Sequence, residues 1–285
     1  MTTIAAPNDI SARAGSAPPT ISRLTALGTL ARRRLLLSAR TPREIVVPLL
    51  TPILFALVIA PALAKMVNSP GLDYKTYVAV GTVGLLVPLS CMFAGIGVIV
   101  DRDSGARREL LAAPVPRSLM VAGNFVVALA VSTLQLGALM LAAIARGAKF
   151  DATGTGVLWF IAAAYLFATA SYGIAEVMAN RIPKQEEYVG ATPAIAILPW
   201  FLAGSLFPIH ALPAGLAAFA KVLPLTHALA VMRYGLIDRH ATGLHDIWGM
   251  SNATGMATLS LVVVAAWAVV LSAASVRVFA KSAVA

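Results

Sequence analysis

Long apolar runs separated by short charged segments make up most of this 285-residue chain. The hydrocarbon core of a bilayer is about 30 Å thick, so a helix needs about 20 apolar residues to cross it. Six runs reach that length, at residues 45–64, 77–100, 118–145, 157–179, 188–207 and 253–279. Because a backbone inside lipid must satisfy its own hydrogen bonds, these runs predict an all-α integral membrane protein with six transmembrane helices.

The segment before the first span has a different pattern. Residues 21–40 place leucines on a partly periodic face and carry five arginines, namely Arg23, Arg32, Arg33, Arg34 and Arg40. An apolar face beside a basic one predicts an N-terminal helix that lies in the membrane interface. A plain solvated helix, or a charge signal that only orients the next span, is the alternative. We interpret residues 1–20, which contain no apolar core stretch, as a disordered cytoplasmic tail ahead of one transmembrane domain at 21–285.

The stretch 198–236 begins as the fifth span and then loses its helical continuity. Three prolines interrupt an otherwise apolar run, namely Pro208, Pro213 and Pro224. Proline removes a backbone donor and breaks a helix interior. The pattern predicts a span that ends near residue 207, then a re-entrant pair of short helices at 211–223 and 225–236. An apolar hairpin with incidental prolines is the alternative. Residues 237–252, which follow, are expected to be a polar loop.

The same stretch resembles the C-terminal signature of the type-2 permeases of ATP-binding-cassette (ABC) transporters. The matching elements are, in order, Ala203-Gly204, Leu206-Phe207-Pro208, Leu212-Pro213, Pro224-Leu225-Thr226 and Arg233. The resemblance implies that the re-entrant helices form an external gate, at Phe207, Pro208, Pro213 and Pro224. It also implies that the first, second and fifth spans line the route, and that the chain assembles with a second permease copy or a paralogous permease. A separate ATPase subunit would supply the energy.

Residues 101–117 are the main polar segment between spans, and they combine acidic residues, a glycine, arginines, a Leu-Leu pair and a proline. In the type-2 permeases, which this segment resembles loosely, the equivalent loop forms the coupling helix that touches the ATPase. The resemblance assigns that contact to Arg108, Glu109, Leu110 and Leu111. Two leucines exposed on a polar loop would be costly without a partner, and a groove on an ATPase would bury them. A positively charged anchor loop that binds nothing is the alternative.

Composition and charge agree with a membrane protein. The chain is 59% hydrophobic, whereas soluble domains are about 45–50% apolar. Its net charge of +10 lies mostly at span ends, so it favours membrane orientation over nucleic-acid binding. Fifteen of the 22 Lys and Arg residues fall on the side of the two termini. The positive-inside rule therefore predicts cytoplasmic termini and an external re-entrant pair. A composition rich in Ala, Gly and Val, with Arg more frequent than Lys, suggests that the membrane is the inner membrane of a bacterium.

Candidate chemistry is sparse. No G-x-x-x-x-G-K-[ST] loop occurs, so we expect no nucleotide site, no cofactor and no enzyme activity in this chain. Ser205 near His210 and His227 raises the idea of a serine protease, but no supporting pattern fixes a base on the serine. The spacing of His240, His245 and Asp246 matches no standard metal-ligand pattern. We therefore predict neither catalytic residues nor a metal site.

Two polar residues in the apolar runs leave the function partly open. Gln135 is a candidate pathway residue, although a plain interhelix hydrogen bond explains it equally well. An ion-coupled secondary transporter or a channel would use Gln135 and Glu176 as coupling groups, and a structural membrane protein is a third hypothesis. The favoured function is the permease subunit of an ATP-driven exporter. Because the spans hold few fixed charges, we expect a hydrophobic or amphipathic cargo, drug or lipid-like.

Overall fold

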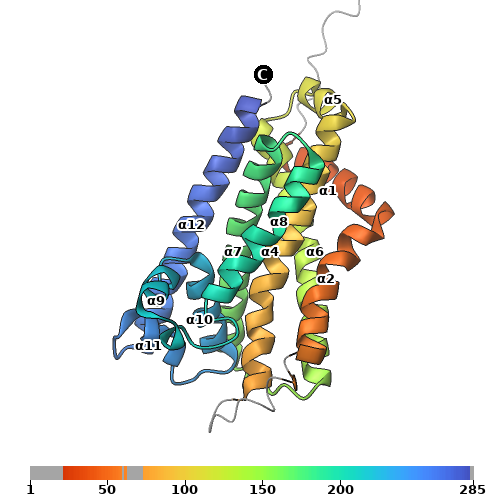
Figure 1. The fold of residues 1–285 in the computed structure, drawn as a ribbon. Helices are drawn as coiled ribbons and strands as arrows, with labels where there is room; N and C mark the ends of the chain where they lie inside the picture. The colour runs from red at the N-terminus through yellow and green to blue at the C-terminus, as the bar shows by residue number, and fades with distance from the viewer. Residues whose placement is uncertain (1–21, 60, 63–72, 283–285) are drawn as a thin grey trace, which may run out of the picture.

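Over the residues that the structure describes, all regular structure is helical. The computed structural model describes residues 22–59, 61–62 and 73–282. Figure 1 shows the long helices side by side in one bundle, with short helices gathered at its two ends. The predicted tail at residues 1–20 lies outside the described residues.

Four helices of the described chain are long and apolar enough to cross a membrane, and a bent helix pair would make a fifth if counted as one span. The four are α4 (Tyr74–Asp103), α6 (Arg117–Ala145), α7 (Gly154–Arg181) and α12 (Ala253–Ser282). The first predicted span overlaps α2 (Pro42–Leu54) and includes the π-helical turn η2 (Phe55–Ile59), and the fifth overlaps α8 (Gln185–Leu202). Large apolar side chains such as Leu134, Leu141 and Val269 are about two-thirds exposed, which suits contact with lipid. The prediction of an all-α membrane protein is confirmed.

The helix expected before the first span is α1 (Arg23–Arg40). The Ser22 side chain caps its first turn by accepting a hydrogen bond from the Thr25 backbone N–H at 3.1 Å. The helix stops at Arg40, and Pro42 begins α2. A residue before proline is disfavoured in the helical conformation, so Thr41 separates the two helices.

Helix α7 is the centre of the bundle, because it packs against α12, α10 (Pro224–Leu236) and α4. Its crossing with α10 depends on two facing glycines. A Cβ added to Gly156 would lie 2.0 Å from the Gly235 carbonyl oxygen, and one added to Gly235 would lie 2.3 Å from that of Gly156. Small residues let membrane helices approach closely, and here the two backbones touch.

We expect Gly156→Ala to destabilise the protein by about 1–3 kcal/mol, since the new methyl group must push α10 off α7. The variant should therefore melt at a lower temperature in detergent. Gly137→Ala in α6 is the matched control, because a Cβ at Gly137 meets nothing within 4 Å. Equal melting temperatures for the two variants would show that the α7–α10 contact is not tight in solution.

Several of the shorter helices differ from the predicted ones in their bounds, and one of them was not predicted. Helix α8 ends at Leu202, five residues before the predicted end, because Gly204 follows with a positive φ of 78°. The re-entrant pair consists of α9 (Ala214–Ala220), shorter than predicted, and α10, and the two helices are bent by 79°. The expectation of a plain loop at 237–252 is wrong, because α11 (Thr242–Trp248) lies there. The remaining short elements are α5 (Ala106–Ala112) and the 3-10 turn η3 (Ile209–Ala211).

The thiol of the chain's one cysteine lies where the helices α4 and α7 pack together. Cys91 on α4 is 1% exposed, and its Sγ lies 3.6 Å from the Ala168 carbonyl oxygen of α7. The thiol is therefore part of the packed interior.

Candidate functional site

Helix α5 forms at the position predicted for a coupling helix. The chain leaves α4 through Gly105, whose φ of +79° favours glycine and ends the long helix. Arg108 and Glu109 on α5 are exposed, whereas Leu110 and Leu111 are half-buried and pack against the hydrophobic core. The expectation that both leucines are freely exposed is therefore wrong, because α5 turns them inward onto its own bundle.

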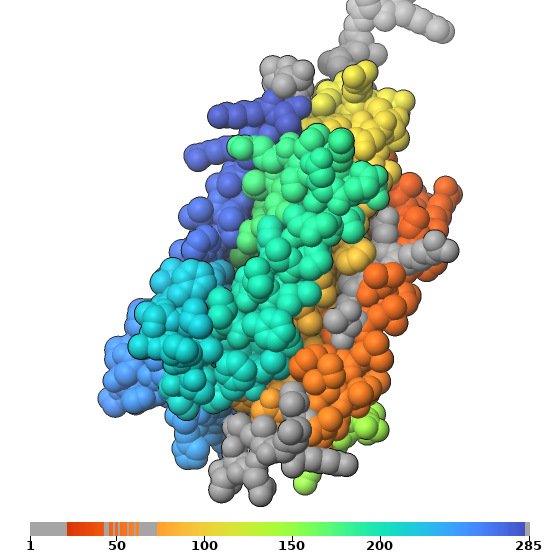
Figure 2. Space-filling view, viewed as in Figure 1, coloured from red at the N-terminus to blue at the C-terminus, as the bar shows by residue number. Residues whose placement is uncertain are grey.

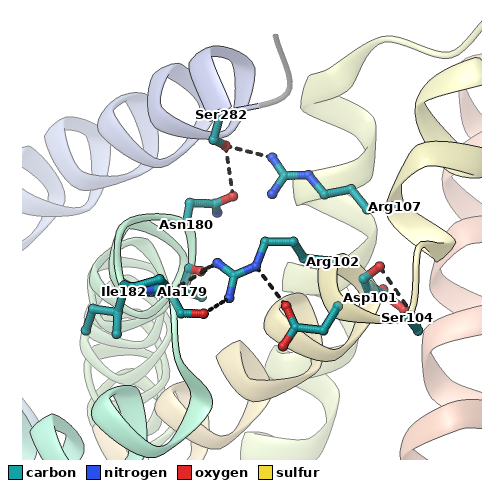
Figure 3. Close-up of polar contacts among 10 residues, drawn as sticks. Asp101, Arg102, Ser104, Arg107, Ala179, Asn180, Ile182 and Ser282 are labelled. Atoms are coloured by element: carbon teal, nitrogen blue, oxygen red, sulfur yellow. Dashed lines mark hydrogen bonds and ion pairs between the residues drawn. The ribbon is translucent and has the colours of Figure 1, made fainter. Parts of the chain in front are cut away.

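Two arginines tie this end of the bundle together, and we refer to Arg102 and Arg107 as the arginine clamp (Figure 3). Arg102, in the last turn of α4, donates to the carbonyl oxygens of Ala179 at 3.1 Å and Ile182 at 3.2 Å. The last carbonyls of a helix have no partners within it, so the guanidinium satisfies groups at the end of α7. The clamp thereby fixes the junction of α4 and α5 to the end of α7.

The second member of the clamp fixes α5 to the last helix. Arg107 donates to the Ser282 hydroxyl at 2.7 Å and the Phe279 carbonyl at 3.4 Å, and its guanidinium lies 4.6 Å from the centre of the Phe279 ring. Ser282 in turn donates to Asn180 at 3.2 Å (Figure 3). Burial lowers the pKa of Arg107 from its ordinary value, yet arginine stays charged at neutral pH. One charged side chain thus links α5, α12 and, through Ser282, α7.

Helix α1 joins the same end through two further arginines. Arg33 makes a two-pronged ion pair with Asp101 at 2.9 and 3.2 Å, and this hydrogen bonding raises the pKa of Arg33. Arg34 is buried and donates to the Ala94 carbonyl at 3.3 Å, over the space left by Gly97. The predicted interfacial helix is therefore attached to α4 directly beside the coupling segment.

The opposite end of the molecule carries the re-entrant pair, with α9, α10 and α11 gathered there in Figure 1. The three prolines of this region mark the starts of helices: Pro208 precedes η3, Pro213 precedes α9 and Pro224 is the first residue of α10. The missing N–H of proline costs nothing at a helix start. Of the predicted gate residues, Phe207 is 40% exposed and Pro208 lines a cavity.

A buried arginine holds this end. Arg233 of α10 is 6% exposed and donates to the carbonyl oxygens of Gly204 at 2.7 Å and Ser205 at 2.9 Å. Its guanidinium also lies 3.5 Å from the centre of the Tyr77 ring, and the Tyr77 hydroxyl donates to Gly204 at 2.9 Å. Arg233 therefore connects α10, the turn after α8 and the first turns of α4.

A cavity of about 570 Å³ opens beside Arg233. It is lined by the start of α4, the turn after α8, α10 and α11, and its lining is rich in charged groups. His210 Nδ1 lies 2.7 Å from Asp246 Oδ2, and Arg239 pairs with Asp151. The cavity thus brings several charged side chains together at the re-entrant end of a largely apolar bundle.

The structure places Gln135 between helices. The residue is fully buried on α6 and accepts a hydrogen bond from the Ser90 hydroxyl of α4. This contact is the interhelix hydrogen bond offered above as the alternative interpretation of Gln135, and a role of Gln135 in the transport pathway stays a prediction. Glu176 is also fully buried, where it accepts hydrogen bonds from the Tyr172 hydroxyl at 2.8 Å and the Asn180 amide at 3.1 Å.

The histidines near Ser205 are engaged elsewhere. His227 lies 2.8 Å from the Lys221 carbonyl oxygen and 3.2 Å from the Ser260 hydroxyl, and His210 pairs with Asp246. Within the described ranges the buried Ser205 hydroxyl has no hydrogen-bond partner. Those ranges also contain no group of three His, Cys, Asp or Glu side chains that could hold a metal ion.

These features define a multi-pass helical membrane protein with a short helix fixed across one end and a re-entrant pair at the other. A family model described as ABC-2 type transporter matches residues 25–237, which is most of the chain. The chain therefore belongs to the ABC-2 type transporter family. The matched domain is the permease part of such a transporter, and it has no ATPase activity. A comparison with curated proteins gives no significant match.

Sequence reasoning missed the residues that hold the two ends together. The clamp arginines entered only the charge count and the loose resemblance of residues 101–117 to a coupling loop, and Arg233 entered only the charge count and a family signature. Their acceptors are mainly main-chain carbonyls and a serine hydroxyl, which no pattern of charged residues reveals. The sequence shows Gly81 in the predicted second span, but only the structure gives its reason: a Cβ there would lie 2.1 Å from the Ser205 carbonyl oxygen that Arg233 also binds.

Proposed function

We propose that this permease is the membrane subunit of an ATP-driven exporter, and that a separate ATPase docks on α5 from the cytoplasm. One observation carries the proposal. Helix α5 presents Arg108 and Glu109 outward, while Arg107 on its inner side holds the end of α12. A force applied to the outer face of α5 would reach the membrane helices through Arg107 and Arg102.

The proposed orientation follows from charge. Arg102, Arg107, Arg108 and Arg117 all belong to the α5 end, so the positive-inside rule favours the cytoplasm for that end. Both termini would then be cytoplasmic, in a bacterial inner membrane, and residues 21–285 would form one transmembrane domain. The cavity beside Arg233 would open to the external side.

The proposed route lies between two permeases, either two copies of this chain or this chain and a paralogue. By family resemblance it is lined by the first, second and fifth spans, which contain α2, α4 and α8. Helix α8 packs against α4 and leaves Val189, Leu198 and Phe201 exposed. An apolar face of this kind suits a hydrophobic or amphipathic cargo, such as a drug or lipid.

The docking proposal is tested by reversing the exposed charges of α5. The double variant Arg108→Glu/Glu109→Arg leaves the net charge unchanged, but it reverses the sign of the charge at both positions that would face the ATPase. We expect the ATPase recovered with the purified permease to fall about tenfold, since like charges across an interface repel strongly. Substitutions at Leu110 and Leu111 are less informative, because they would also disturb the packing of α5 on its own core.

The matched control is Asp151→Arg/Arg239→Asp, which reverses a pair at the other end with both side chains more than 60% exposed. It should leave ATPase recovery unchanged. Undiminished recovery with the α5 variant would contradict the docking proposal. Transport in liposomes that needs no ATP but stops when the proton gradient collapses would overturn the energy source and favour the ion-coupled alternative.

A further inference from the structure

The cavity beside Arg233 is large enough to hold a small molecule. Its volume of about 570 Å³ lies within the range of about 300–1,000 Å³ that is usual for ligand pockets. Most of its buried lining comes from α4, the turn after α8 and α10, whereas its exposed lining comes from the loops, η3 and α11 around them. Figure 2 shows α11 at the surface of this end of the molecule. Because the exposed lining lies there, a ligand would enter from the re-entrant end.

One face of α10 forms a wall of this cavity. Thr226, Ala230 and Arg233 all line it, and their spacing of four and three residues places them on the same side of the helix. The apolar members of the lining are Ala203, Ile209, Ala230 and Ile237. Polar and apolar groups thus lie side by side, and a ligand that fits them carries a polar group joined to an apolar part.

Two donors of this wall have no hydrogen-bond acceptor among the described residues. Thr226 is 3% exposed and Arg233 is 6% exposed, yet the Thr226 hydroxyl and Nε of Arg233 make no hydrogen bond there. Helical threonines elsewhere in the chain, such as Thr82, Thr169 and Thr192, donate to the carbonyl four residues earlier. Thr226 lies in the first turn of α10 and makes no such bond. Buried donors in native proteins nearly always have an acceptor, and a ligand oxygen would supply it here.

Two carboxylates of the lining each have an oxygen atom left over once the described contacts are assigned. Asp246 pairs with His210 through Oδ2, and Asp238 accepts the hydrogen bonds of the first turn of α11 through Oδ2. Oδ1 of each accepts no hydrogen bond within the described ranges. Both carboxylates act electrostatically on Tyr77, whose ring lies against Arg233, but neither forms an ion pair with that arginine. The cavity thus presents positive and negative groups that do not neutralise each other directly.

We propose that this cavity binds a small zwitterion of the amino acid type, which carries a carboxylate, an ammonium group and an apolar side chain. The carboxylate lies on the α10 wall, against Arg233 and Thr226. The ammonium group faces Asp238 and Asp246, and the side chain lies on the apolar lining. A ligand of a single charge leaves one of the two sets unpaired, and a site with unpaired polar groups rejects such a ligand. The cavity is at the opposite end from α5, so the site requires neither ATPase docking nor a particular cargo.

The test measures binding of radiolabelled L-phenylalanine by equilibrium dialysis to the full chain, purified in neutral detergent with any subunit that accompanies it. We expect saturable binding. The analogue 3-phenylpropionate lacks the ammonium group and phenethylamine lacks the carboxylate, so each should compete about tenfold more weakly than phenylalanine. Absence of saturable binding, or equal competition by either analogue, would overturn the proposal.

Thr226→Val tests the carboxylate contact, because it removes the hydroxyl but keeps the shape of the side chain. It should weaken phenylalanine binding about tenfold, as expected for a hydrogen bond to a charged group. Ser205→Ala is the matched control, since Ser205 also has a buried hydroxyl without a partner in the described chain but does not line the cavity. The control should bind phenylalanine like the unaltered chain. Equal affinities of the two variants would contradict the assigned position of the ligand.

Asp246→Asn tests the ammonium contact. The variant keeps an acceptor for His210 but loses the negative charge, so phenylalanine should bind about tenfold more weakly while 3-phenylpropionate competes as before. Weaker binding of both molecules would show that the change acts on the shape of the cavity, and would count against the ammonium contact. A lipid head group with phosphate and ammonium has related charges, so glycerophosphoethanolamine is a further competitor. Stronger competition by it than by unlabelled phenylalanine would identify a lipid site and overturn the proposal.

Discussion

Arg233→Gln is expected to lower the thermal stability of the permease strongly, because this arginine is buried at the re-entrant end. The Arg233 guanidinium donates hydrogen bonds to the carbonyl oxygens of Gly204 and Ser205 and lies over the Tyr77 ring. All of these groups lie in a buried site. Hydrogen bonds to a charged group contribute about 1.5–3 kcal/mol, and a buried acceptor left without a donor adds a further penalty. The total loss should be about 3 kcal/mol, measured as a lower melting temperature in detergent.

Two comparisons make the expectation for Arg233 specific. Arg233→Lys keeps the charge, but a lysine cannot donate to both carbonyl oxygens as the guanidinium does. Its melting temperature should therefore lie between those of the unaltered chain and the glutamine variant. Arg239→Gln removes another arginine at the same end whose side chain is 63% exposed, and it should change stability little. If Arg233→Gln and Arg239→Gln have the same melting temperature, the buried arginine does not stabilise this end.

Arg107→Gln is expected to release α5 from α12 without unfolding the bundle. The variant loses the bonds to the Ser282 hydroxyl and the Phe279 carbonyl, together with the contact over the Phe279 ring. A loss of about 2 kcal/mol would speed local opening roughly 30-fold. Hydrogen–deuterium exchange should therefore accelerate at residues 106–112 and 276–282, while residues 224–236 at the other end exchange as before.

The same experiment tests whether α5 transmits the work of the ATPase. In the complex with its ATPase, adding ATP should alter exchange in α10 of the unaltered chain, and this response should be lost in Arg107→Gln although the ATPase still binds. Arg277→Gln is the control, since Arg277 is exposed on α12 and does not contact α5 through any bond in the described structure. An undiminished response in Arg107→Gln would remove Arg107 from the coupling route.

Hydrophobic patterning predicted the long helices well, because membrane depth and backbone hydrogen bonding leave few alternatives. The spans expected at 118–145 and 157–179 correspond to α6 and α7 within a few residues. The fifth span was predicted too long, because residues 203–207 are apolar enough for lipid. There Gly204 adopts a left-handed conformation and ends the helix, which hydropathy does not register.

The candidate sites were predicted less completely, for a physical reason. The loose family resemblance placed a coupling helix around Arg108–Leu111, and the helix α5 lies there. Which side of a seven-residue helix faces inward depends on the neighbouring helices, so the burial of Leu110 and Leu111 did not follow from the sequence. The same limit applies to α11, whose short mixed sequence at residues 242–248 gives no clear helical pattern. Asp238 supports its first turn by accepting hydrogen bonds from the Thr242 hydroxyl and the Gly243 backbone N–H.

The burial of Cys91 makes the natural chain a ready background for site-specific labelling. A thiol that is 1% exposed inside the α4–α7 contact is shielded from maleimides and spin labels in the folded protein. Two cysteines introduced at exposed positions, one on α5 and one on α9, would then be the reactive groups, with no native residue to remove first. Spectroscopic distances between the two ends of the bundle could be followed through the nucleotide cycle in a protein whose packing is otherwise intact.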